Sequence, residues 1–191
     1  YIEGTDTPVE LEDGTTAESI TGAGNIGEDY TTNPLENVAE KYELVEVPSN
    51  ANGTYGEEEE IVTYYYRIKT YKITTKVEER IETTVTGETS IVKGGTITGE
   101  GETAYEIVDY GESSTKQIAI IPADDVHKVS KITINGIEQE FTENEDGTVV
   151  LSLFENVTED KEIIVTFERI PTKLIVHHYI EGTENKVPLS N

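Results

Sequence analysis

The chain has 191 residues, enough for one large domain or two small ones, with 39 acidic and 14 basic residues and a net charge of −25. A negative field of this size repels nucleic-acid phosphates and anionic lipid headgroups, and no apolar run approaches the ~18 residues that span a bilayer, so we expect neither nucleic-acid binding nor membrane insertion. The absence of cysteine excludes disulfides, thiolate metal sites and a thiol nucleophile.

The opening stretch, YIEGTDTPVEL (residues 1–11), returns near the end of the chain as YIEGTENKVPL (residues 179–189). The two stretches are identical at seven of eleven positions, at an offset of 178 residues. A repeat at this spacing indicates a slice of a longer repetitive chain. We expect a first module at residues 1–69 that lacks most of its opening strand, a second module at 70–169, and the start of the next repeat at 170–191.

The first module is predicted to hold the only helix. The residues TNP (32–34) offer a cap followed by proline, and LENVAEK (35–41) continues the pattern for about two turns. Before the predicted helix, GAGNIG (22–27) matches the glycine spacing of the dinucleotide-binding motif G-x-G-x-x-G. Because two acidic residues follow at once and no helix begins there, we interpret this stretch as a turn between strands.

A long alternating stretch, residues 63–85, predicts strand structure across the junction of the two modules. On it, Tyr64 and Tyr66 share the face that we expect to be buried. Tyr65 and Tyr71 share the other face, where their rings are candidates for stacking on sugars or on a protein partner. The alternative, which we favour, is that these two tyrosines pack at the junction, expected at residues 67–71, and stiffen it.

The second module contains an Asn135-Gly136 pair between two alternating runs, which predicts a hairpin over residues 131–141 with a type I′ turn. A further turn at residues 143–147 extends the prediction to a three-stranded meander that ends at Leu153. A last strand is expected at residues 161–168. The expected core residues of these strands are Ile132, Ile134, Ile137, Phe141, Leu151, Leu153, Ile163, Val165 and Phe167.

We expect no catalytic residue, no metal site and no cofactor. The acidic run at residues 57–60 is interpreted as a solvated turn, with weak calcium binding as the alternative. His177 and Glu181 share a strand face while His178 points to the opposite one, so a third metal ligand is missing. With 39 acidic residues some carboxylate pair always looks suitable for catalysis, so a count alone indicates no active site.

Five short stretches in the first module occur in an order that resembles a MucBP-type (mucin-binding protein) repeat. The second module, with GGTITGEGE, ITINGIEQEF and FENVTEDKEIIVTFE, is similar to β-sandwich stalk repeats of the same kind of protein. The first resemblance rests on YIEGT, GEDYTT, YELV, NGT and VTYYY. It implies a mainly β chain: a small β-grasp-like module, an immunoglobulin-like β-sandwich and a C-terminal strand that opens the next repeat.

The resemblance also implies a non-catalytic repeat region of a secreted, cell-wall-associated surface protein of a Gram-positive bacterium. Such a region acts in adhesion or as a stalk, with mucin or another host glycoprotein as the implied partner. The alternative is an accessory, non-catalytic region of a large secreted enzyme such as a carbohydrate-active hydrolase. Because Lys173–Ile180 reads as a strand without its own module, we also expect it to extend from the body or to exchange onto the first module of a neighbouring molecule.

Overall fold

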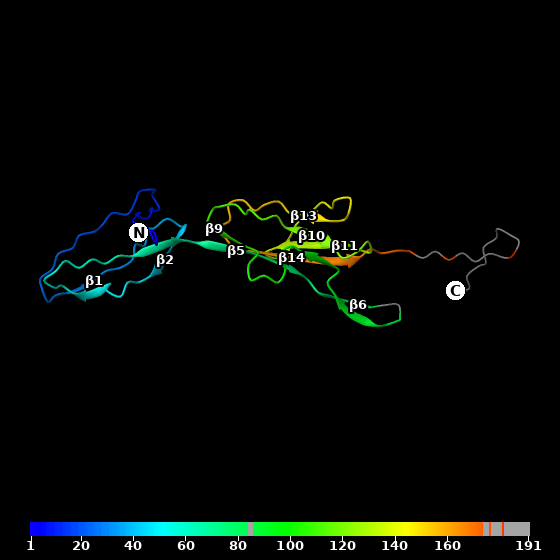
Figure 1. The fold of residues 1–191 in the computed structure, drawn as a ribbon, viewed down its shortest axis with the longest axis horizontal. Coiled ribbons are helices and arrows are strands. Elements are labelled where there is room, and N and C mark those ends of the chain that lie inside the picture. The colour runs from blue at the N-terminus through cyan, green and yellow to red at the C-terminus, as the bar shows by residue number, and fades with distance from the viewer. Residues whose placement is uncertain (84–85, 174–175, 177–180, 182–191) are drawn as a thin grey trace.

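The computed structural model describes residues 1–83, 86–173, 176 and 181. This part of the chain contains fourteen strands and no helix, so the mainly β prediction is confirmed. The strands form two regions that follow one another along an elongated molecule, with β1 (Asp29–Thr31) near one end and the end of the last strand, β14 (Lys161–Arg169), on the far side of the second region (Figure 1). We call residues 1–69 the N-terminal region and residues 70–169 the central region.

The N-terminal region is built from two antiparallel pairs, β1 (Asp29–Thr31) with β3 (Asn52–Thr54) and β2 (Tyr42–Glu46) with β4 (Tyr65–Ile68). Its first residues add a parallel bridge, in which Ile2 lies opposite Tyr66 of β4. Tyr66 is 2% exposed, as the alternation of the sequence predicts. The core of this region is small and consists of Val9, Tyr42 and Tyr66, with Ile2, Ala17, Leu35, Val38, Ala39, Leu44 and Tyr64 packed around it.

The helix predicted at residues 35–41 is wrong. Val38 instead forms an antiparallel bridge with Leu11, and the amide of Ala39 donates to the carbonyl of Glu10 at 2.9 Å. The amide of Leu35 donates to the hydroxyl of Tyr66 at 2.8 Å. The cap signal is local, whereas these backbone groups find partners in distant segments and keep Leu35 and Val38 against the core without a helix.

The central region contains two sheets around one core. The larger sheet has the strand order β12 (Ile137–Glu138), β11 (His127–Ile134), β14 (Lys161–Arg169), β5 (Thr70–Val77) and β9 (Glu106–Asp109). The smaller has the order β13 (Val149–Val150), β10 (Ala119–Pro122) and β8 (Gly95–Ile97). Both sheets contribute to the buried cluster Ile73, Val77, Ile97, Val108, Ile118, Ile120, Val129, Ile132, Val149, Val157, Ile163, Val165 and Phe167.

The first and last strands of the central region, β5 and β14, lie side by side in parallel. Five residue pairs join them, from Lys161 opposite Ile73 to Val165 opposite Val77. The predicted strand at residues 161–168 is confirmed, and Ile163, Val165 and Phe167 are each fully buried. All other pairings in the larger sheet are antiparallel.

The predicted hairpin is confirmed, because β11 pairs with β12 through a turn in which Asn135 and Gly136 have φ angles of 50° and 77°. The meander is wrong. The chain leaves the larger sheet after β12, and β13 pairs with β10 in the smaller sheet instead. Val149 is thereby buried, while two residues expected in the core, Ile137 and Leu153, are 69% and 47% exposed.

The alternating stretch at residues 63–85 is divided between three strands, β4, β5 and β6 (Arg80–Thr83). Among the described residues, β6 pairs with β7 (Thr89–Val92) alone, and this hairpin extends away from the two sheets (Figure 1). Its cross-strand partners Ile81 and Ile91 are 73% and 70% exposed. Most of the strand predicted at Lys173–Ile180, including His177 and His178, lies outside the described residues.

Candidate binding surface and the junction between the regions

Tyr65, the first of the two predicted ligand-binding tyrosines, lies on the outer face of β4. Its side chain is 43% exposed, while the next residue, Tyr66, points into the core. Arg67 follows on the outer face and its Nε lies 2.7 Å from Oε1 of Glu43 on β2. Tyr65 therefore presents an exposed aromatic ring next to the Arg67–Glu43 ion pair. This combination is suited to stacking on, and hydrogen bonding with, a cyclic polar ligand.

Tyr71, the second predicted tyrosine, belongs to the other region. It lies on β5, is partly buried against the core of the sandwich, and its ring centroid is 6.3 Å from that of Tyr110 at a tilt of 46°. No contact between the rings of Tyr65 and Tyr71 occurs among the described residues. Tyr65 remains a surface candidate, whereas Tyr71 packs beside the junction.

A single residue, Lys69, connects β4 to β5, and both sides of its peptide backbone are hydrogen bonded. Its amide donates to the carbonyl of Lys41 in the N-terminal region at 2.9 Å. Its carbonyl accepts from the amide of Tyr110 in the central region, also at 2.9 Å. The linker therefore has little freedom to bend, because bending breaks one of these bonds.

A side-chain bond crosses the same junction. The hydroxyl of Tyr110 donates to Oε2 of Glu40 at 3.0 Å. This hydrogen bond to a carboxylate raises the pKa of Tyr110, since ionising the phenol would remove the donor and place two negative charges together. Sequence reasoning missed both residues, because nothing in their local patterns predicts that they meet.

A second tyrosine pair was also missed. Tyr30 lies in β1 and Tyr55 directly follows β3, and their ring centroids are 5.4 Å apart. The turn at residues 22–27 lies against Tyr55, and a Cβ atom on Gly24 would come within 2.2 Å of the Tyr55 ring. The sequence predicts a turn rather than a nucleotide site at residues 22–27. In the structure this segment packs on Tyr55, and Gly24 allows the close approach because it has no side chain.

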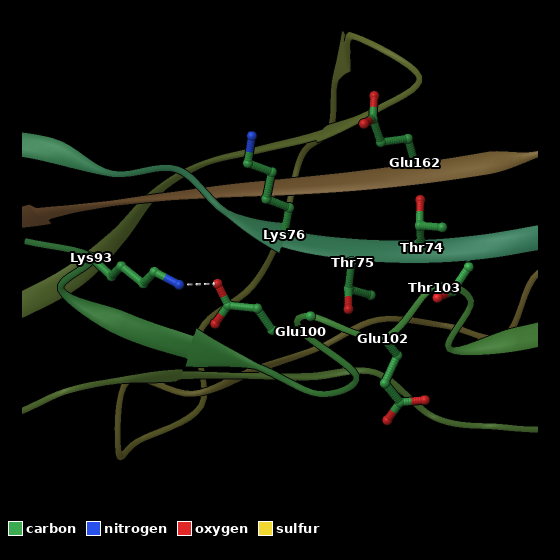
Figure 2. Close-up of a pocket in the computed structure, with 9 residues that line it drawn as sticks. Thr74, Thr75, Lys76, Lys93, Glu100, Glu102, Thr103 and Glu162 are labelled. Atoms are coloured by element: carbon green, nitrogen blue, oxygen red, sulfur yellow. Dashed lines mark hydrogen bonds and ion pairs between the residues drawn. The ribbon is translucent and has the colours of Figure 1, made fainter.

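Figure 2 shows a shallow polar depression on the central region, beside β5. Lys93 Nζ and Glu100 Oε1 pair within it at 2.6 Å, which raises the pKa of Lys93. The hydroxyl of Thr75 donates to the carbonyl of Thr98 at 2.8 Å. The other side chains drawn around it belong to Thr74, Lys76, Glu102, Thr103 and Glu162.

Among the described carboxyl groups, all clear pKa shifts have the same direction. A general acid near neutral pH needs a carboxyl group with a raised pKa. Every carboxyl whose pKa clearly departs from its ordinary value in this part of the chain is shifted downward, by hydrogen bonds to its charged form. No cluster of ligands that could hold a metal ion occurs among the described residues.

One charged cluster anchors the β6–β7 hairpin to the larger sheet. His127 Nδ1 lies 2.5 Å from Asp124 Oδ1, and its Nε2 lies 3.3 Å from Glu82 Oε1 on β6. Arg80 Nη2 pairs with the same Glu82 oxygen at 2.5 Å. The hydrogen bond to His127 lowers the pKa of Asp124. These contacts join β6 to the larger sheet, while Nε of Arg80 is buried without a hydrogen-bond partner.

Residues 10–67 match the MucBP domain family, so the N-terminal region carries a MucBP-type repeat, as its sequence predicts. MucBP is a non-catalytic repeat family that occurs in surface proteins of Gram-positive bacteria. The search of curated proteins found no match, and neither did the search of solved structures. No helix in the described part of the chain has the length and apolar character needed to cross a membrane.

Proposed function

We propose that this chain is a non-catalytic repeat region of an extracellular, cell-wall-associated surface protein of a Gram-positive bacterium, and that it acts as a stalk that bears tension. Residues 1–69 and 70–169 are its two modules, and residues 170–191 begin the next repeat. The match to the MucBP family supports the class of protein. The way in which the chain enters and leaves each region supports the stalk.

In both regions the entering and leaving segments are parallel neighbours. Ile2 lies opposite Tyr66 in the N-terminal region, and β5 lies beside β14 in the central region. Pulling on the two ends of such a region slides its first and last strands past each other along their own axes. All hydrogen bonds between them then carry load together, whereas bonds of a hairpin pulled at its open end break one at a time.

The junction adds stiffness to this arrangement. One residue, Lys69, separates β4 from β5, and its backbone is bonded to both regions. At the far end of the central region, the amide of Ile170 donates to the carbonyl of Val126 at 2.7 Å, which ties the outgoing chain to the body. A one-residue connection whose amide and carbonyl are both hydrogen bonded resists swivelling of the modules more than a free linker does.

Pulling the full chain by its two ends in a single-molecule instrument tests the proposal. A stalk should unfold in discrete, cooperative steps, one for each region, at forces above those that open a simple hairpin. Gradual extension without rupture events would contradict the load-bearing role.

Binding to mucin or another host glycoprotein is the second candidate function. It is supported by the family match and by the exposed ring of Tyr65 beside Arg67. The two functions are compatible, because the outer face of β4 is separate from the strand contacts that would bear load. An accessory role in a secreted carbohydrate-active enzyme remains the alternative, and a catalytic domain elsewhere in the same polypeptide would favour it.

A further inference from the structure

A free carboxylate lies beside the exposed ring of Tyr65. Glu46 of β2 is directly opposite Tyr65 of β4, so their side chains are neighbours on the outer face of this strand pair. Glu46 is exposed, and no residue in the described part of the chain forms an ion pair with it. An anionic group stacked on the Tyr65 ring would therefore lie close to a negative charge that no cation offsets.

The one cation on this face is already engaged. Arg67 is the only basic residue of β2 and β4, and its Nε lies 2.7 Å from Oε1 of Glu43. The hydrogen bond to Glu43 raises the pKa of Arg67, and the negative charges of Glu43 and Glu3 raise it further. The carboxylates of Glu3, Glu43 and Glu46 thus outnumber the single guanidinium near Tyr65, and no cation remains to pair with an acidic ligand.

The rest of the N-terminal region adds charge of the same sign. Residues 1–69 contain 16 acidic and three basic residues. Salt screens each charge over about 8 Å at physiological ionic strength, so the nearest carboxylates matter most. The more distant ones still add to a negative field through which an acidic polymer must approach, whereas an uncharged ligand meets no such barrier.

We propose that the outer face of β4 binds neutral glycan chains in preference to glycans that carry carboxylate or sulfate groups, and that Glu46 sets this preference. A neutral sugar can stack on the ring of Tyr65, and its hydroxyl groups can donate hydrogen bonds to the free carboxylate of Glu46. An acidic sugar at the same place would set two negative charges side by side. The proposal rests on the glycoprotein binding proposed above and names the class of glycan.

Binding of the full chain to purified mucin before and after sialidase treatment, which removes the carboxylate-bearing sugars, tests the preference. The affinity should rise about threefold or more after treatment. Added salt should strengthen binding to untreated mucin and have little effect on binding to treated mucin. Tighter binding to untreated mucin would overturn the preference but leave glycoprotein binding intact. No binding to either mucin would overturn glycoprotein binding, and the preference with it.

The role of Glu46 is tested by the ratio of the two affinities, treated mucin over untreated mucin. Glu46→Gln removes the charge at nearly constant shape, so the ratio should fall about threefold towards one. Glu102→Gln is the matched control, because it removes the same charge from an exposed position in the central region and should leave the ratio unchanged. An unchanged ratio in Glu46→Gln, or an equal fall in both variants, would overturn the assignment to Glu46.

Discussion

The hydroxyl of Tyr110 in the central region donates a 3.0 Å hydrogen bond to the carboxylate of Glu40 in the N-terminal region. The two residues lie beside Lys69, whose backbone bonds to both regions. Together these contacts hold two small cores in one orientation, although a single residue separates their strands.

Tyr110→Phe should loosen this junction without unfolding either region. The substitution removes the hydroxyl but keeps the ring beside Tyr71. We expect a wider spread of distances between fluorophores placed on the two regions, and an unchanged melting temperature. Tyr105→Phe is the matched control, because the Tyr105 hydroxyl donates to the carbonyl of Gln117 within the central region. An unchanged distance distribution in Tyr110→Phe would show that the backbone contacts suffice.

Tyr66→Phe should destabilise the N-terminal region. The hydroxyl of Tyr66 accepts the amide of Leu35, and the tyrosine is 2% exposed, so its loss leaves a donor without a partner. The expected loss is about 1–3 kcal/mol of unfolding free energy, measured by urea denaturation. Tyr65→Phe should be neutral. Equal stability of the two variants would contradict the account of why residues 35–41 are not helical.

Gly95→Ala should destabilise the sandwich. A Cβ atom at this position would lie 2.3 Å from Cζ of Phe167 and 2.6 Å from the carbonyl oxygen of Ile121, and the backbone atom cannot move aside. We expect a loss of about 1–3 kcal/mol by denaturation. Gly56→Ala, which meets only one atom at 3.9 Å, serves as the control. A neutral Gly95→Ala would mean that β8 packs on β14 less closely than described.

Glu106 should make the stability of the central region depend on acid pH. Burial alone raises its pKa, but hydrogen bonds from Thr115 and Lys116 outweigh this and lower the pKa below its ordinary 4.5. A lowered pKa stabilises the fold above pH 4.5, and this contribution is lost as the pH falls through the folded-state value.

Glu106→Gln should therefore be less stable than the unmodified chain near pH 7, and the difference should shrink in acid. Urea midpoints measured from pH 7 to pH 3 test this. Glu102→Gln, at an exposed position, should show no such difference. A constant deficit of Glu106→Gln at all pH values would contradict the assignment.

If the outer face of β4 binds glycoprotein, Tyr65→Ala should weaken binding of the full chain to purified mucin while its melting temperature stays the same. Tyr71→Ala should instead lower the melting temperature, because Tyr71 packs on the core. Binding that survives both substitutions would place a mucin site elsewhere. If the unmodified chain shows no saturable binding at high micromolar concentration, the stalk is the only one of the two functions that remains.

The sequence predicts features that depend on neighbours in the chain. The alternation of Ile163, Val165 and Phe167 identifies a buried strand, and Asn135-Gly136 identifies a tight turn, because both follow from local geometry. The resemblance to a MucBP-type repeat, which rests on short stretches of sequence, is likewise confirmed by the family match of residues 10–67.

What the sequence does not predict is the choice of distant partners. Nothing local distinguishes a Val149 that pairs within a meander from one that pairs with Ile120 in the other sheet. The helical cap signal before Leu35 is likewise overridden by contacts with Glu10 and Tyr66. The parallel pairing of β5 with β14 and the meeting of Tyr110 with Glu40 are of the same kind, since in each case the partners lie far apart in the sequence.

The stalk account depends most on the parallel pair of β5 and β14, and the direction of pulling tests it directly. Because the chain lacks cysteine, handles can be attached at Thr70→Cys and Arg169→Cys, which shears the pair, or at Thr70→Cys and Glu159→Cys, which opens it from one end. The account predicts a rupture force several-fold higher for the first pair of handles than for the second. Equal forces, or a lower force for the first pair, would contradict it.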